Sequence, residues 1–208
     1  MSDAFSRYDV YAVSGSLYCY KDSNVLRNHF GLQDSKQLRM IEAEVSAARQ
    51  SEMLAHPLPG RFTTAHLCNI HRRLFGDVYP FAGHLRYEDI AKGETRFLAN
   101  HQIKEKLHSL LKELRNEQFL DGSDRDTLVL RSAYYMAELN YIHPFREGNG
   151  RTIREFMRLL FLRQGYSVDW GAVPVDHLLQ AMIDSVYDTE SLTQVLSQCL
   201  KQHERKLV

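Results

Sequence analysis

Hydrophobic residues recur at helical spacing along most of the chain. Apolar positions at i, i+3, i+4, i+7 and i+8 indicate a helix with one buried face. Segments with helical spacing, or with a dense apolar stretch free of Gly and Pro, are residues 38–48, 67–75, 103–114, 127–142, 153–161 and 192–200. The pattern therefore predicts a mainly helical chain with short connections.

The same spacing predicts which side chains of these helices are buried. In the first segment, the expected buried face consists of Leu38, Ile41, Val45 and Ala48. In the fourth, the apolar surface is broader and is expected to contain Leu128, Leu130, Tyr134, Ala137, Leu139 and Tyr141. A surface that wide is typical of a helix in the middle of a bundle.

Capping residues mark the ends of several predicted helices. Asp34 precedes the first segment, and Thr63 or Thr64 precedes the second. Gly76 and Gly165 are expected to end the second and fifth helices, because glycine accepts the backbone that closes a helix. Residues 121–124, Asp-Gly-Ser-Asp, form a turn-rich connector between two helices.

One stretch breaks the helical pattern. Residues 86–91 and 95–98 contain residues that favour strands, and they flank Lys92-Gly93-Glu94. Gly93 can supply the positive φ that a tight turn needs. The stretch predicts a β-hairpin, with an irregular surface loop as the alternative. The expected fold is therefore mainly α, a helical bundle with one hairpin.

Length and charge narrow the class of protein. The 208 residues are expected to form a single domain, 1–208, with its core at about 25–200 and a peripheral segment at 1–24. Acidic and basic residues balance to a net charge of +0, which argues against direct nucleic-acid binding. We see no membrane-spanning apolar run and no N-terminal signal, so we expect a cytoplasmic protein, or one secreted into a host cell if it is an effector.

Cysteine and histidine spacing does not indicate a metal site of its own. Cys19, Cys68 and Cys199 are odd in number and far apart, which favours reduced thiols. His66 and His71 stand five residues apart, whereas a zinc-binding pair on a helix favours four. We therefore look for the chemistry of the chain elsewhere.

The densest chemistry lies in residues 143–151, HPFREGNGR, followed by Arg154. Seven positions of this run, at ~5% usage each, match by chance at about one in 10⁹ starting points. Because Pro144 disfavours helical backbone at His143, the preceding helix ends there and the run forms a loop between two helices. Its three residues Gly148-Asn149-Gly150 then begin the second helix, where free N–H groups and the helix dipole favour an anion.

Each polar side chain of this run suits one task at a nucleotide. Arg151 and Arg154 are spaced to hold adjacent phosphates. Glu147 suits a Mg²⁺ that takes further ligands from substrate phosphates. His143, at the mouth of the loop, can accept a proton from an incoming hydroxyl. The alternative is a polar loop between two helices with a solvated arginine face.

The run resembles the signature of Fic domains, His-Pro-Phe-x-(Asp/Glu)-Gly-Asn-Gly-Arg-x-x-Arg, at every position. The resemblance implies a Fic-type helical bundle with a hairpin flap, and the transfer of AMP from ATP onto a protein hydroxyl with pyrophosphate leaving. Carried over by position, His143 is the general base, Phe145 packs the loop into the core and Glu147 holds Mg²⁺. The remaining assignments are the anion hole, Gly148, Asn149 and Gly150, and the phosphate ligands, Arg151 and Arg154.

The resemblance extends over roughly residues 25–200 and is strongest to the bacterial toxin branch of the family. Residues 75–83 resemble the segment that leads to the family's hairpin, and residues 165–170 resemble the stretch after its motif helix. Fic hairpins pair with an extended segment of the target protein. The resemblance thus implies a target-docking flap formed by Lys92, Gly93, Glu94, Thr95, Arg96 and Phe97.

Gly150 bears on which group is transferred. The related Doc-type toxins carry Lys at this position and act as kinases, because ATP binds them in the reverse orientation. By analogy, Gly150 favours AMP transfer over phosphorylation. Transfer of another nucleotide or phosphate-linked group, such as UMP or phosphocholine, is an alternative, and so is a non-catalytic nucleotide-binding module. The presence of His143 and Glu147 argues against the module, which needs no base.

The resemblance also leads to expectations about partners. Many Fic proteins are inhibited by a helix with the pattern Ser/Thr-x-x-x-Glu-Gly/Asn. No Ser or Thr stands four places before any of the glutamates Glu42, Glu44, Glu52, Glu190 and Glu204. We therefore expect a toxin whose separate small antitoxin supplies a glutamate that reaches Arg154. Related toxins modify the ATPase subunits of DNA gyrase and topoisomerase IV, which are the expected targets. Tyr187 resembles helix-boundary tyrosines that line the nucleotide pocket, or are self-modified, in some Fic proteins. The alternative is an ordinary interface tyrosine.

Overall fold

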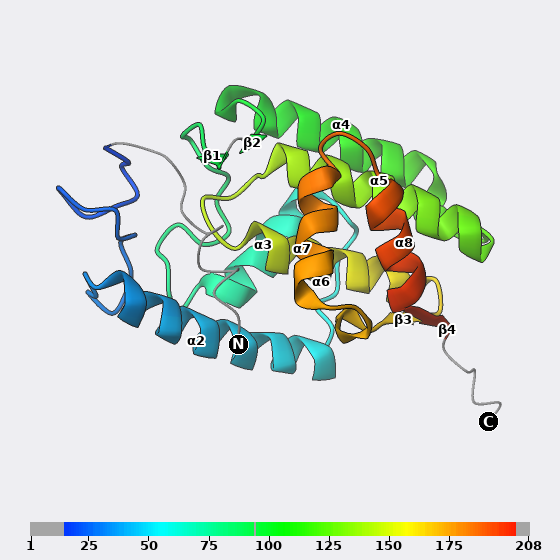
Figure 1. The fold of residues 1–208 in the computed structure, drawn as a ribbon, viewed down its shortest axis with the longest axis horizontal. Coiled ribbons are helices and arrows are strands. Elements are labelled where there is room, and N and C mark those ends of the chain that lie inside the picture. Colours follow the sequence, from blue (N-terminus) through cyan, green and yellow to red (C-terminus); the bar gives the residue numbers. More distant parts are fainter. Residues whose placement is uncertain (1–14, 94, 203–208) are drawn as a thin grey trace.

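The computed structural model describes residues 15–93 and 95–202, which form a helical bundle with two small sheets (Figure 1). The helices are α2 (Ser35–Ala55), α3 (Thr64–Phe75), α4 (Ile103–Asn116), α5 (Arg125–Ile142), α6 (Asn149–Arg163), α7 (Val175–Asp184) and α8 (Glu190–Cys199). Short 3-10 turns lie at Asn100–Gln102, Gln118–Leu120 and Trp170–Ala172. The strands are β1 (Ala91–Lys92), β2 (Thr95–Arg96), β3 (Tyr166–Val168) and β4 (Leu200–Gln202). The prediction of a mainly helical fold is confirmed.

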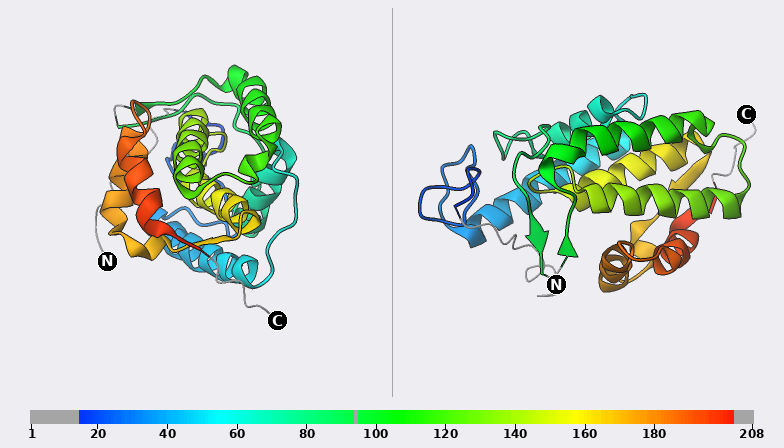
Figure 2. Two further views of the ribbon diagram at one scale, coloured as in Figure 1. Left: turned by 90° about the vertical axis from the view of Figure 1, so that its right-hand side faces the viewer. Right: turned by 90° about the horizontal axis from the view of Figure 1, so that it is seen from above.

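Helices α5 and α6 form the centre of the bundle. Seen end-on in the left view of Figure 2, they are surrounded by the other helices. Helix α6 contacts α3 and α5, and α5 also contacts α4 and α8. The apolar face predicted for α6 is buried, including Phe156, Met157 and Leu160. Because α5 and α6 are adjacent in the chain and central in the fold, the loop between them is held from several sides.

Most of the predicted helix ends are confirmed. The Asp34 side chain accepts a hydrogen bond from Gln37 N at 2.8 Å, and the Thr63 hydroxyl accepts one from His66 N at 3.3 Å. The Asp124 carboxylate caps α5 in the same way, at 2.8 Å from Thr127 N. These contacts satisfy N–H groups that a helix leaves without a partner in its first turn.

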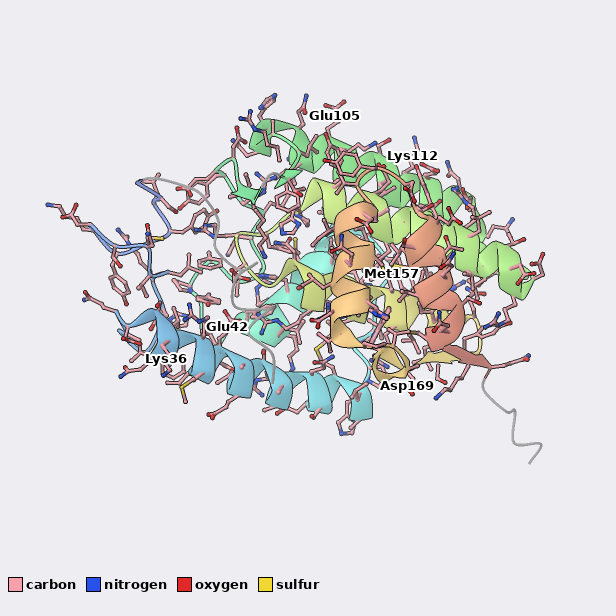
Figure 3. All side chains as sticks on the ribbon, in the orientation of Figure 1. Lys36, Glu42, Glu105, Lys112, Met157 and Asp169 are labelled. Carbon is pink, nitrogen blue, oxygen red and sulfur yellow. The ribbon has the colours of Figure 1, made fainter. Side chains whose placement is uncertain are left out.

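The buried face of α2 differs from the prediction. Ala48 is exposed, whereas Glu42, Ser46 and Met53 are buried together with Leu38. Figure 3 shows Glu42 on the side of α2 that faces the other helices. Polar residues can be buried when polar partners meet them, and hydrophobic spacing does not reveal such partners.

Two further predictions about helices were wrong. Leu130 in α5 is 56% exposed, because the helix does not bury its whole circumference. Leu200 does not continue α8 but begins β4, whose pairing with β3 was not foreseen. Helix α7 was also missed, although Leu178, Ala181 and Met182 follow helical spacing after Pro174.

The predicted β-hairpin is confirmed, with strands shorter than the stretch that predicted it. Ala91 pairs with Arg96 and Lys92 with Thr95, in antiparallel register, and the hairpin projects from the bundle in the right view of Figure 2. Gly93 has φ 54°, the positive value expected for the turn. Glu94 lies outside the described residues.

The chain before α2 packs on the hairpin side of the molecule. The Ser16 hydroxyl donates to a Glu88 carboxylate oxygen at 2.7 Å, and the Tyr18 ring stacks on Tyr87 with centroids 4.4 Å apart. Tyr18 is 4% exposed and so belongs to the core. Among the described helices, none combines the length and apolar character needed to cross a membrane.

Candidate active site

The loop between α5 and α6 has unusual backbone conformations at both ends. Helix α5 ends at Ile142, and His143 follows with φ 46°, in the left-handed region. Gly148 precedes α6 with φ 75°. The chain thus leaves one central helix and enters the next within seven residues. The N–H groups at the start of α6 have no earlier helical turn to bond to, as predicted.

Asn149 closes the loop from inside. Its side-chain oxygen accepts from Phe145 N at 2.9 Å, and its side-chain nitrogen donates to Phe145 O at 2.8 Å. Phe145 is fully buried. Both polar atoms of the Asn149 side chain therefore bond within the loop. The predicted anion hole would then bind an anion through the backbone around Gly148 and Gly150.

His143 is held in one tautomer. Its Nδ1 lies 3.0 Å from the carbonyl oxygen of Asn140, and a carbonyl only accepts, so Nδ1 carries the proton. Nε2 is then the basic nitrogen. The Phe97 ring from the hairpin stacks on the imidazole with centroids 3.7 Å apart. Burial, followed by the nearby positive charge of Lys92, holds the pKa of His143 well below its usual value, so the ring is neutral at neutral pH.

Arg86 connects the hairpin to His143, a role that the sequence did not indicate. The guanidinium is 3% exposed and donates to the carbonyl oxygens of His143 at 2.8 Å and Glu88 at 2.6 Å. It also donates to the carbonyl oxygen of Leu98, at the end of the hairpin. A single buried cation thus fixes the backbone of the loop and both sides of the hairpin.

A cavity of about 550 Å³ brings most of the predicted site residues together. Its lining includes Lys92, Thr95, Phe97, His143, Glu147, Gly148, Asn149, Gly150, Arg151 and Arg154. Gly93, Arg96 and Tyr187 do not line it, although Val186 does. The Tyr187 side chain is 83% exposed. A space of this size suits a nucleotide-sized ligand.

Part of the cavity lining is apolar. It comes largely from α7, which had not been predicted, and includes Leu178, Leu179, Met182 and Ile183. Asn140 ties this wall to α5, because its side-chain nitrogen donates to Met182 O at 2.7 Å. The cavity lining therefore combines polar groups, which suit a charged ligand group, with apolar groups, which suit a planar one.

The two motif arginines have different surroundings. Arg151 forms an ion pair with Glu42, donates to the Ser46 hydroxyl at 2.8 Å and lies over the Phe75 ring at 4.6 Å. Arg154 is half-buried, and no ion pair within residues 15–93 and 95–202 involves it. Burial and the charge of Arg151 lower the Arg154 pKa to about 10, so it is still a cation at neutral pH. An anion in the cavity would meet Arg154 with its charge uncompensated.

Glu42 and Ser46 are site residues that the sequence did not indicate. Glu42 also accepts a hydrogen bond from the Tyr79 hydroxyl, so both of its carboxylate oxygens have partners. Burial, followed by the charge of Glu42, raises the pKa of the Tyr79 phenol, which therefore remains a donor. Glu42 and Ser46 lie on α2, 30 or more positions from their partners Tyr79 and Arg151. No local spacing in the sequence therefore connects them.

The position of Glu147 is compatible with the Mg²⁺ ligand role that the sequence predicts for it. It lines the cavity beside Gly148, and its Oε1 accepts from Gly148 N at 2.8 Å. The described residues contain no group of three or more His, Cys, Asp or Glu that could hold a metal by themselves. One carboxylate next to a phosphate site is the donor set that Mg²⁺ uses when nucleotide phosphates and water complete its shell.

Comparison with known proteins identifies close relatives. The profile described as the Fic/DOC family matches residues 61–161. Protein adenylyltransferase VbhT of Bartonella schoenbuchensis is 37% identical over 186 residues, which are 89% of this chain and 39% of that protein. The chain thus spans well under half of that relative. "Probable protein adenylyltransferase Fic" of Salmonella typhimurium is 36% identical over 79% of this chain and 81% of its own length.

Solved structures agree with these matches. The N-terminal Fic domain of a VirB-translocated Bep effector from Bartonella quintana, with bound ADP, superposes with a TM-score of 0.83 at 26% identity. That match covers 90% of this chain and 95% of the other. BepC from Bartonella tribocorum, with bound AMPPNP, gives a TM-score of 0.82 at 25% identity, over 90% of this chain and 97% of that one.

Proposed function

Because the chain belongs to the Fic/DOC family of protein adenylyltransferases, we propose that it transfers AMP from ATP to a hydroxyl side chain of a target protein. The observation that carries the proposal is the single cavity that joins His143 to the glycine-lined start of α6 and to Arg154. A base, an anion site and an uncompensated cation are the groups that nucleotidyl transfer to a hydroxyl requires.

The proposed reaction exchanges one P–O bond for another and transfers one proton. The target hydroxyl oxygen attacks the α-phosphorus of ATP, and its proton passes to Nε2 of His143. The bond from the α-phosphorus to the bridging oxygen breaks, and pyrophosphate leaves. The Asn140 carbonyl keeps His143 in the tautomer whose Nε2 is basic. Its lowered pKa keeps the ring unprotonated before the hydroxyl arrives.

In the proposed complex the phosphates lie against the start of α6. Backbone N–H groups there, and the Arg154 guanidinium, face the charge that the leaving pyrophosphate carries. A Cβ added at Gly150 would lie 3.3 Å from Arg154 Nη1, so glycine keeps the space between them open. A Mg²⁺ held by Glu147 would supply further neutralisation of the phosphate charge when bound.

ATP is the proposed donor for two reasons. The relatives' structures hold ADP and AMPPNP, both adenine nucleotides. The apolar wall from α7 also offers Leu178 and Met182 to a planar base. Apolar contacts discriminate weakly between bases, so transfer of UMP or of a phosphocholine group is the alternative.

The proposed target is a protein, and the hairpin is the proposed docking flap. An extended target segment would add alongside the short hairpin strands, using their backbone groups. Phe97 stacks on His143, so a side chain seated by the hairpin would arrive next to the base. The ATPase subunits of DNA gyrase and topoisomerase IV are the leading candidate targets. Tyr187 is a candidate for self-modification, because it is exposed and follows Val186 at the cavity.

Labelled ATP tests the proposed reaction directly. The protein is incubated with bacterial lysate and with ATP labelled at the α- or the γ-phosphate. We expect the α label, and not the γ label, on protein bands. A γ label on protein would indicate a kinase, and no label from either would remove the enzyme proposal. Tyr187→Phe is run in parallel, and equal labelling of the purified variant would exclude Tyr187 as the main self-modified residue.

We also propose that a small antitoxin controls the enzyme through Arg154. No described carboxylate pairs with this arginine, and it lies in the cavity where phosphates are proposed to bind. A partner glutamate would neutralise it and exclude the phosphate that it holds. The proposed toxin role depends on this second protein. The proposed transfer reaction does not.

Co-expression tests the antitoxin. We expect a short open reading frame next to the gene whose product co-purifies with the chain and relieves growth inhibition. The matched control is the partner with its glutamate changed to Gln, which should bind less tightly and fail to protect the cell. Harmless expression of the chain alone, with no co-purifying partner, would contradict the toxin–antitoxin proposal.

A further inference from the structure

His71 of α3 is a buried histidine next to the motif loop, and the proposed reaction does not use it. The side chain is 0% exposed. Its Nε2 lies 2.9 Å from the carbonyl oxygen of Glu147, and its Nδ1 lies 2.7 Å from the backbone N of Gly83. The ring stacks on Phe145, with centroids 3.9 Å apart and planes at 14°. One imidazole on α3 therefore contacts two other segments, the chain at Gly83 and the motif loop at Phe145 and Glu147.

These contacts allow one arrangement of protons. The Gly83 N–H can only donate, so Nδ1 must accept. The Glu147 carbonyl can only accept, so Nε2 must carry the proton and donate. A neutral ring with its proton on Nε2 therefore satisfies both groups at once.

The Glu147 carbonyl lies between two parts of the proposed nucleotide site. Glu147 supplies the proposed Mg²⁺ ligand, and its carbonyl is followed by Gly148, which adopts φ 75° and begins the anion site. Asn149 fixes the loop at Phe145, which precedes Glu147 in the chain. His71 is thus the described side chain that fixes the peptide between Glu147 and Gly148 from outside the loop.

We propose that His71 is a positioning residue for the transfer reaction, acting through its hydrogen bond to the Glu147 carbonyl. The inference rests on the proposed function, because it assigns His71 to the same site. It holds the peptide that sets both the direction of the Glu147 carboxylate and the first N–H groups of the anion site. The ordinary alternative is a core histidine whose loss affects stability alone.

Two isosteric variants separate the two hydrogen bonds. In His71→Gln the side-chain amide lies where Nε2 was and can still donate to Glu147. In His71→Asn the amide lies where Nδ1 was, so the Gly83 contact is kept and the Glu147 contact is lost. Both variants lose one hydrogen bond and the ring stacking, so we expect similar losses of stability, measured by thermal unfolding.

The two variants should differ in function. We measure ADP affinity by calorimetry with and without Mg²⁺, and kcat and KM for AMP transfer. Loss of a group that orients a metal ligand typically costs 10–100-fold. We expect His71→Asn to lose about 10–100-fold in the Mg²⁺-dependent gain in ADP affinity and in kcat, and His71→Gln to stay within about threefold of wild type. Equal losses in both variants, a larger loss in Gln, or no loss in Asn would each overturn the proposal.

A measurement on the wild-type protein covers the case in which a variant does not fold. In a protein with ¹⁵N-labelled histidine, we expect His71 to be the Nε2–H tautomer with a slowly exchanging proton. An Nδ1–H tautomer would overturn the proposal. If wild type binds ADP with Mg²⁺ and the variants show the expected pattern in ADP affinity, but no AMP is transferred, the proposed function fails while the assignment of His71 to the nucleotide site stands.

Discussion

Replacing His143 with alanine is expected to lower the rate of AMP transfer by about 10²–10⁴, the usual contribution of a positioned general base. Nucleotide affinity should change little, because the proposed anion site consists of the start of α6 and Arg154 rather than the imidazole. The expected signature is thus a fall in kcat with ADP affinity nearly unchanged. Without His143, the proton of the target hydroxyl has no base to accept it. Among the described residues, no other histidine lines the cavity.

Single-turnover transfer of α-labelled AMP and calorimetric titration with ADP measure the two quantities separately. His108→Ala is the control, because His108 is an exposed histidine on α4, away from the cavity. It should transfer AMP at the wild-type rate. If His143→Ala retains transfer within about tenfold of wild type, His143 is not the general base.

The second large effect is expected at Gly148. Its φ of 75° lies in the left-handed region, which costs a residue with a Cβ about 1–2 kcal/mol. A Cβ there would also lie 2.3 Å from the fully buried Phe75 ring, and such overpacking costs about 1–3 kcal/mol more. Gly148→Ala should therefore lower the free energy of unfolding by about 2–5 kcal/mol. It should also abolish nucleotide binding, because the start of α6 must move.

Gly165→Ala is a matched control for this prediction. Gly165 has φ 78°, almost the same backbone, but a Cβ there meets nothing within 4 Å. Gly165→Ala should lower the free energy of unfolding only by the cost of the left-handed backbone, about 1–2 kcal/mol, and should keep ADP binding. Urea denaturation compares the two variants. Equal losses would mean that the Phe75 contact adjusts freely and that Gly148 is required only for its backbone.

Local sequence patterns predicted much of the bundle. The face of α6 and the caps Asp34 and Thr63 depend on residues within a few positions of one another. The hairpin was predicted from Gly93 and its flanks for the same reason. Helix α7 followed an equally local pattern, and it was missed although Leu178, Ala181 and Met182 show its spacing.

The motif at residues 143–154 was recognisable because the chemistry of phosphate binding constrains neighbouring residues. Its placement between two helices also followed from the sequence, since Pro144 and Gly148 determine where helices can end and begin. The contacts that hold the motif did not follow. Glu42, His71 and Arg86 meet it from 57 to 109 positions away.

The sequence by itself predicted most of the helices, the hairpin and the proposed reactive groups, because these depend on backbone preferences and side-chain chemistry within short windows. The tertiary structure decided which arginine is neutralised, which nitrogen of His143 is basic and which side chains hold the loop. Arg151 is neutralised and Arg154 is not, because α2 brings Glu42 to Arg151. Such differences arise when distant segments pack together, and burial then makes each polar partner energetically significant.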